Sequence, residues 1–201
     1  IGFVSENPAV ATVNADGEVT GVAAGKTQIQ VTVGVVSTSV AVTVTDCPVN
    51  GIDVSKWQQD IDWKTVKASG IKFAMLRLAH GSSKDIQFEN FYSGATEQGI
   101  PVGIYCYSTA KSVAEGKKEA ENLLEMLDGK ELTYPIALDL EDNAQLKNMN
   151  KAQRTKLILE YKKIVEDAGY DFIVYANLNW LTNYIDQKKL EENDVDIWIA
   201  R

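Results

Sequence analysis

The stretch YPIALDLED, residues 134–142, carries the pattern that decides the fold of this chain. Aliphatic side chains occupy every second position: Ile136, Leu138 and Leu140. A period of two predicts a β-strand whose apolar face is buried. Asp139 and Glu141 fall on the opposite face, and unpaired carboxylates are costly to bury in an apolar setting. We therefore predict that the two acids face a functional cavity.

From residue 50 onward, segments of strand pattern alternate with segments of helical pattern. The expected strands are 51–55, 73–79, 101–108, 134–141, 172–177 and 196–201. The expected helices are 60–69, 87–98, 112–128, 150–168 and 179–185. Repeated strand–helix units predict an α/β fold with a parallel sheet and helices outside it. Six such strands favour a TIM-like (β/α) barrel over an open sheet.

The first part of the chain, residues 1–46, has no helical pattern. It contains alternating runs at 27–33 and 39–45, separated by Gly and Asn-Ala-Asp-Gly turn signals. Short alternating strands of this kind predict a small all-β sandwich. We therefore expect three parts: an all-β domain at 1–46, a linker at 47–50 and the barrel at 51–201.

If the aliphatic residues of each barrel strand face the helices, the other set faces inward. The inward set near the strand ends is Asp53, Tyr105, Tyr107, Asp139, Glu141, Tyr175, Asn177 and Trp198. Acids ringed by aromatic side chains are typical of a carbohydrate cleft, where carboxylates act at the glycosidic bond. Crowding of the acids is expected to raise one pKa. Arg77 shares its parity with aliphatic residues and is left outside the predicted pocket, and Trp57 and Trp63 are expected to pack.

Composition narrows the class of partner. The formal net charge of −8 argues against nucleic acid or an anionic membrane as the main partner, because both reward a basic surface. No apolar run approaches the roughly 20 residues that span a bilayer. The lone His80 has no second histidine beside it, so neither a metal site nor a cofactor is expected. Cys47 and Cys106 are expected to be free thiols, with Cys106 buried.

Several stretches resemble known families. GIDVSKWQQDIDWKTVKASGIKFAMLRLAHG, QGIPVGIYCYS, YPIALDLED, FIVYANLNWL and DIWIAR are similar to glycoside hydrolase family 25, the bacterial and phage muramidases. NPAVATVNADGEVTGVAAGKTQIQVTV resembles the bacterial Ig-like domain, group 2, found on secreted and surface proteins. The first resemblance runs from about residue 50 to the last residue, with its motifs in the correct order.

The resemblance implies a secreted or surface-associated bacterial enzyme, of Gram-positive type, that cleaves the β-1,4 bond between N-acetylmuramic acid and N-acetylglucosamine in peptidoglycan. It implies that Glu141 is the general acid, that Asp139 orients the acetamido group or stabilises charge, and that Asp53 supports them. The implied sugar subsites are lined by Tyr105, Tyr175 and Trp198. Tyr107 and Asn177 complete the set of predicted substrate-binding residues.

Two departures from the family pattern stand out. Cys106-Tyr107 occupies the place where the family often has His-Phe. The chain also stops within the sixth expected strand, whereas the family continues through two more strands, the last of which contributes a further aspartate. We therefore expect an incomplete barrel and a fragment of a longer protein.

Two alternative functions stay open. The chain could be a non-catalytic module that binds or spaces cell-wall glycan, and truncation favours that reading. A chitinase-like barrel is a second alternative, although the longer acidic motif typical of chitinases is not found.

Overall fold

The computed structural model describes residues 1–44 and 49–200. The chain divides into two compact units, residues 1–49 and residues 50–201. Cys47 and the first half of the expected linker lie outside the described residues, as do the last residues of the runs expected at 39–45 and 196–201. Among the helices that the structure describes, none combines the length and the apolar character needed to cross a membrane.

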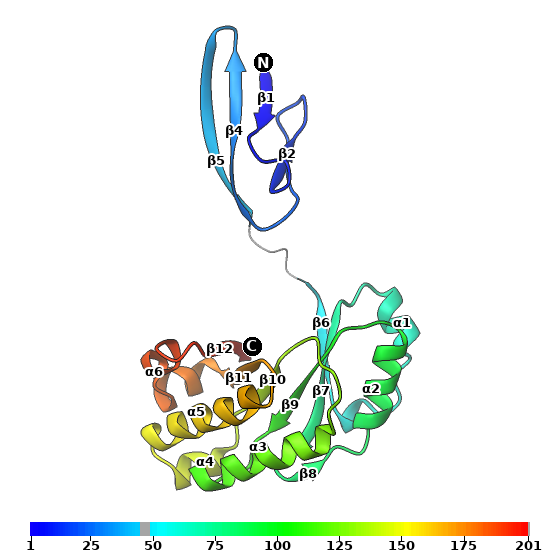
Figure 1. The fold of residues 1–201 in the computed structure, drawn as a ribbon, viewed down its shortest axis with the longest axis vertical. Coiled ribbons are helices and arrows are strands. Elements are labelled where there is room, and N and C mark those ends of the chain that lie inside the picture. Colours follow the sequence, from blue (N-terminus) through cyan, green and yellow to red (C-terminus); the bar gives the residue numbers. More distant parts are fainter. Residues whose placement is uncertain (45–48, 201) are drawn as a thin grey trace. The chain divides into compact units, whose positions relative to one another are not determined.

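The first unit consists of antiparallel strands (Figure 1). One sheet has the order β1 (Gly2–Ser5), β4 (Gly25–Val33) and β5 (Val36–Val44). A second, smaller sheet pairs β2 (Ala11–Val13) with β3 (Val19–Gly21). The all-β class is as predicted, whereas the three short strands were not located from the sequence. Only Ala11, Ile29 and Thr27 are buried among the described residues of this unit, so its core is small.

The second unit is built on a sheet of parallel strands. In the described residues its order is β12 (Asp196–Ala200), β11 (Phe172–Asn177), β10 (Ile136–Asp139), β9 (Val102–Tyr107), β7 (Phe73–His80) and β6 (Gly51–Val54). A short strand, β8 (Ser83–Lys84), pairs antiparallel with the end of β7. All six predicted strands are present, and the sheet forms an incomplete TIM-like barrel, as predicted.

Helices follow the strands and cover the sheet (Figure 1). Four of them are α1 (Trp63–Ala68), α2 (Phe88–Glu97), α3 (Val113–Leu127) and α5 (Lys151–Asp167). Each lies within a segment expected to be helical. The segment 179–185 contains a π-helical turn, η2 (Trp180–Tyr184), and three short helices were not expected: η1 (Lys56–Gln58), α4 (Asn143–Asn148) and α6 (Gln187–Glu191). Gly99 and Gly169 follow α2 and α5 with φ of 62° and 87°, the left-handed conformation that terminates a helix.

The buried core of the second unit lies between the outer face of the sheet and the helices. It includes Ile136, Leu138 and Leu140 from the quoted stretch, together with Leu123 from α3 and Leu157 and Ile158 from α5. These aliphatic residues therefore face the helices, as the strand period predicts. Cys106 belongs to the same core and is a free, buried thiol.

The opposite face of the sheet is closely filled at its N-terminal end. A Cβ atom added to Gly103 would lie 2.6 Å from the sulfur of Met75 and 2.8 Å from the carbonyl oxygen of Pro135. Only glycine fits there, because real Cβ atoms do not approach other atoms so closely. The inner face of the sheet is therefore packed near the N-terminal ends of the strands, and the open space lies toward their C-terminal ends.

Candidate active site

Four aromatic or acidic side chains form a row across the sheet at the C-terminal ends of the strands. Asp139 of β10 pairs in register with Tyr107 of β9 and with Tyr175 of β11. Tyr175 in turn pairs with Trp198 of β12. Residues in register on parallel strands point to the same face, so these side chains share the inner face of the sheet.

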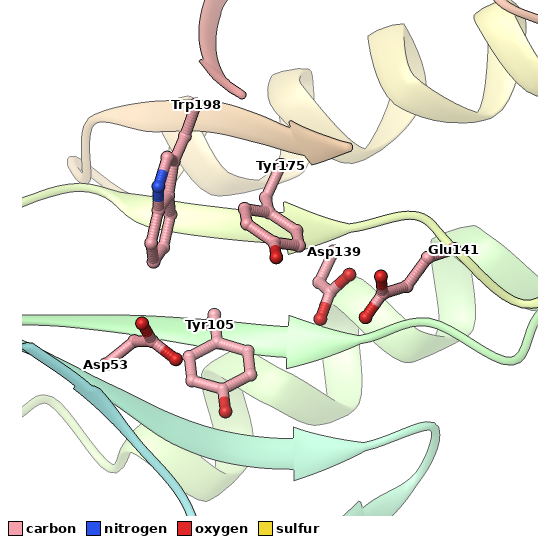
Figure 2. Close-up of a pocket in the computed structure, with 6 residues that line it drawn as sticks. All are labelled: Asp53, Tyr105, Asp139, Glu141, Tyr175 and Trp198. Atoms are coloured by element: carbon pink, nitrogen blue, oxygen red, sulfur yellow. The ribbon is translucent and has the colours of Figure 1, made fainter. Parts of the chain in front are cut away.

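A pocket of about 100 Å³ opens beside this row. Its lining is shown in Figure 2 and consists of Asp53, Tyr105, Asp139, Glu141, Tyr175 and Trp198. The carboxyl groups of Asp139 and Glu141 point toward one another, and Asp53 reaches the pocket from β6 beside Tyr105 (Figure 2). Six of the eight side chains predicted to form the site thus line one cavity. They come from five different strands or strand ends, which only the folded sheet brings together.

Asp139 is the most buried acid of the pocket, with 4% of its surface exposed. Its Oδ1 atom is buried and has no hydrogen-bond partner among the described residues. Burial and the nearby carboxylates of Glu141 and Asp53 raise the pKa of Asp139 from its ordinary value of 3.8 to about 8, although Arg77 opposes this rise. Asp139 therefore holds a proton at neutral pH in the free chain.

The raised pKa falls on Asp139, whereas the resemblance assigns the role of general acid to Glu141. Asp139 lies within β10, while Glu141 follows the strand and is only half-buried. The two carboxyl groups differ in their access to water, and burial is the largest cause of the raised pKa of Asp139. A group that covered Glu141 would reduce this difference.

Two of the aromatic side chains around the acids form a fixed wall. The rings of Tyr175 and Trp198 lie 4.7 Å apart between centroids at 70°, an edge-to-face arrangement. On the other side, burial raises the pKa of Tyr105 to about 12, so its hydroxyl stays protonated. The pocket therefore combines ionisable carboxyl groups with rigid ring faces and a phenolic donor.

The remaining two predicted site residues lie elsewhere. The ring of Tyr107 stacks on His80, with centroids 4.7 Å apart and planes 3° apart, and lines a neighbouring hollow. The side-chain oxygen of Asn177 accepts a hydrogen bond from the backbone N–H of Trp180 at 3.0 Å. Neither belongs to the lining of the acid pocket.

Polar residues behind the sheet hold the strand ends in place. The backbone N–H of Ser108 donates to the carbonyl oxygen of Asp139 at 2.9 Å. The Ser108 hydroxyl donates to buried Glu119 of α3 at 2.6 Å and accepts from Gln145 of α4 at 3.0 Å. Asp142, the residue after Glu141, caps helix α4, which begins at Asn143. Ser108 thus connects β10, α3 and the helix that follows the second acid.

Sequence reasoning missed Arg77, which lies on the inner face of the sheet. Arg77 pairs in register with Tyr105, and a bulge in β7 at Leu78 brings His80 into register with Tyr107. The guanidinium is neutralised by buried Asp85, with Nε and Nη2 each 2.7 Å from Oδ2. Every residue of β7 from Ala74 to Ala79 is buried, so hydrophobicity alone did not distinguish its two faces. The one charged residue in that run was the available signal.

Within the described residues, no group of three or more His, Cys, Asp or Glu side chains is placed to hold a metal ion. The carboxyl groups that line the pocket can donate a proton, accept a proton and stabilise positive charge. These are the actions that glycosidic bond cleavage requires.

Comparison with known proteins agrees with this geometry. Residues 52–201 match the sequence profile described as Glycosyl hydrolases family 25, which is well over half of the chain. The chain belongs to glycosyl hydrolase family 25. Residues 1–44 match the bacterial Ig-like domain, group 2, so the family 25 unit is preceded by an Ig-like unit.

Relatives of the family 25 unit include the autolytic lysozyme of Clostridium acetobutylicum. It is 26% identical over 151 residues, which cover 75% of this chain and 44% of the relative. The chain thus spans less than half the length of that curated relative. Among solved structures, a family 25 glycosyl hydrolase from Bacillus anthracis superposes with a TM-score of 0.65 at 25% identity, covering 76% of this chain and 70% of the other.

The modular autolysin LytC of Streptococcus pneumoniae shares the fold, with a TM-score of 0.62 at 21% identity. The match covers 85% of this chain and 43% of LytC, whose structure was solved in complex with a synthetic peptidoglycan ligand.

Proposed function

We propose that the family 25 unit is an N-acetylmuramidase that hydrolyses the β-1,4 bond between N-acetylmuramic acid and N-acetylglucosamine in bacterial peptidoglycan. The observation that carries this proposal is the buried Asp139 carboxyl group with an unpartnered oxygen, set beside Glu141 in a ring-lined pocket. Buried polar atoms are normally hydrogen-bonded, so an orphaned oxygen in a pocket indicates a place for a substrate group.

In this proposal the more deeply buried Asp139 holds a proton in the free chain. A sugar that covers half-exposed Glu141 removes water from it and favours its protonated form. Glu141 then donates the proton to the glycosidic oxygen as the bond from that oxygen to the anomeric carbon breaks. Asp139, left ionised, faces the acetamido group and stabilises the positive charge that develops on the sugar. The anomeric carbon finally takes up a hydroxyl group from water, and the second proton of that water returns to the acid pair.

Asp53, Tyr105, Tyr175 and Trp198 have supporting roles. The carboxyl group of Asp53 lies at the other end of the pocket, on the side of Tyr105. The edge-to-face pair of Tyr175 and Trp198 offers an apolar surface on which a sugar ring can lie. The Tyr105 hydroxyl can donate a hydrogen bond to the substrate. Tyr107 and Asn177, outside the pocket lining, remain predicted contacts for more distant sugars.

The proposal extends to the setting of the protein. We infer that it acts outside the cell, at the wall of a bacterium of Gram-positive type, and that its partner is the peptidoglycan glycan strand. We also infer that residues 1–46 and 51–201 are separate domains joined by 47–50. Membership of family 25 together with the Ig-like match supports these inferences.

The test is the release of reducing sugar from purified peptidoglycan by the chain and by its Glu141→Gln variant. Positioned proton transfer contributes about 10²–10⁴-fold to rate, so a loss of that size is expected. Glu121→Gln on the exposed face of α3 is the matched control and should retain full activity. Equal release by Glu141→Gln would remove Glu141 from the mechanism, and wall binding without turnover by the parent chain would support the non-catalytic alternative.

A further inference from the structure

A second, larger hollow lies next to the acid pocket. Its volume is about 560 Å³, against about 100 Å³ for the acid pocket. Its lining includes Lys56, Trp57, Arg77, His80, Ile86 and Tyr107, and we name it the Trp57 hollow. Tyr107 is the register partner of Asp139, so the two cavities are neighbours on the same face of the sheet. The acid pocket alone is too small to hold a glycan polymer. The sugars on either side of the cleaved bond must extend into neighbouring space such as the Trp57 hollow.

Large apolar side chains gather at this hollow without being covered. Trp57 is 73% exposed and Ile86 is 82% exposed, and both line it. Trp57 was expected to pack inside, as Trp63 does, and that expectation is wrong. An exposed tryptophan beside a cavity offers a flat apolar face, the kind of surface on which sugar and peptide groups are bound.

The position of Trp57 is held by the fold. It lies in η1, whose first turn is capped by a reciprocal pair of hydrogen bonds between Ser55 and Gln58. The backbone N–H of Lys56 donates to Asp85 at 3.1 Å, which ties η1 to the buried Arg77–Asp85 pair. Gln59, directly after η1, has φ of 53° and ψ of −121°, a conformation that is unfavourable for a residue other than glycine. Such strain persists where the surrounding structure enforces it, often at binding sites.

The charge of the hollow is opposite in sign to that of the acid pocket. Arg77 is neutralised by Asp85, and Lys84 pairs with Glu89. In the described part of the chain, no carboxylate lies within ion-pair distance of Lys56, whose ammonium group is 5.0 Å from the centre of the Trp57 ring. Lys56 therefore leaves one uncompensated positive charge beside an exposed ring, next to a pocket with three carboxyl groups.

We propose that the Trp57 hollow binds a carboxylate-bearing part of the wall glycan, with the carboxylate on Lys56 and the adjoining sugar or peptide surface on Trp57. This inference rests on the proposed function. The carboxylate has two sources in peptidoglycan: the lactyl group of an N-acetylmuramic acid residue that carries no peptide, or the stem peptide, whose amide bond consumes the lactyl carboxylate. Lys56 and Trp57 are then specificity residues, which distinguish charged wall glycan from uncharged N-acetylglucosamine polymers.

The test is a titration of the 201-residue chain carrying Glu141→Gln, so that bound sugars are not cleaved. Three probes are compared by calorimetry: neutral chitotetraose, a peptide-free tetrasaccharide of alternating N-acetylglucosamine and N-acetylmuramic acid, and the same tetrasaccharide with stem peptides. Lys56→Gln is expected to weaken binding of at least one charged probe, the one whose carboxylate Lys56 holds, about tenfold, the effect of losing one charge-assisted hydrogen bond, and to leave chitotetraose unchanged. Trp57→Ala is expected to weaken binding of the charged probes by a similar factor.

The matched control is Lys72→Gln, an exposed lysine at the opposite end of β7, which should bind all three probes like the parent. Loss for the peptide-free tetrasaccharide identifies the lactyl carboxylate as the source, and loss only for the peptide-bearing probe identifies the stem peptide. Unchanged binding in both variants, or an equal loss for chitotetraose in Lys56→Gln, overturns the inference. If the parent chain still cleaves peptidoglycan in that case, the proposed function survives. If the chain neither binds nor cleaves any glycan, both fail.

Discussion

The segment formed by β10 and the two residues after it has two faces. One face presents Ile136, Leu138 and Leu140 to the helices. The other face presents Asp139 and Glu141 to a pocket. Both faces are built on the same backbone, and the alternation of side chains alone separates them. On the helix side the three aliphatic side chains are buried in the core. On the pocket side a buried carboxyl oxygen has no hydrogen-bond partner among the described residues. The contrast shows that one face contributes stability, while the other gives up stability to hold reactive groups in place.

A large loss of stability that does not depend on the Asp139 proton is expected from a change on the helix side. Leu138→Ala should lower the free energy of unfolding by about 2–5 kcal/mol, because it removes buried methyl groups and leaves a cavity in the core. Urea denaturation followed by circular dichroism measures this loss. Leu178→Ala, at a position 63% exposed, is the matched control and should change stability by less than about 0.5 kcal/mol. Similar values for the two variants would contradict the assignment of Leu138 to the core.

The division between the two faces could be predicted from the sequence because it depends only on the strand period. The positions of Asp139 and Glu141 and of their aromatic neighbours Tyr105, Tyr175 and Trp198 followed from the same reasoning. The strand period of two does not predict side-chain direction where the backbone departs from a regular strand. The bulge at Leu78 reorients the end of β7, and the buried run around Arg77 has no polar face to mark its direction.

Other features depend on contacts between distant segments. The exposure of Trp57 results from a short helix that is anchored by Asp85, about thirty residues further along the chain. The ring of Tyr107 stacks on His80 and lies outside the lining of the acid pocket. The local pattern of the sequence contains neither interaction, so Trp57 was expected inside the core and Tyr107 inside the acid pocket.

A second effect is expected from the pocket side, and its size depends on pH. Folded Asp139 holds its proton up to about pH 8, whereas the unfolded chain releases it near the ordinary value of 3.8. Between these values the native state binds more protons, so its stability falls as pH rises. Asp139→Asn should remove this fall: the variant should unfold later than the parent at pH 8 and at a similar temperature at pH 4. Thermal unfolding across this range measures it, and parallel curves for the two proteins would refute the raised pKa.

The smallest effect, a slight change in the pKa of Asp139, is expected when the Arg77–Asp85 ion pair beside the pocket is removed. The Arg77 cation lowers the pKa of Asp139, so its removal should raise that pKa slightly. The double substitution Arg77→Met with Asp85→Asn takes away both charges together, which avoids an uncompensated buried charge and should change stability by only about 1 kcal/mol. The pH at which Asp139 loses its proton should move upward. A downward movement would mean that Arg77 does not act on Asp139 as a cation.

The most direct test of the account is a titration of the Asp139 side-chain carboxyl carbon by NMR, in the parent chain and in Glu141→Gln. If the carboxyl groups converge in one poorly hydrated pocket, Asp139 titrates near pH 8 in the parent and at a lower pH when the neighbouring charge of Glu141 is removed. Titration of Asp139 near pH 4 in both proteins would mean that the two side chains are apart and in water, and the proposed reaction centre would be lost.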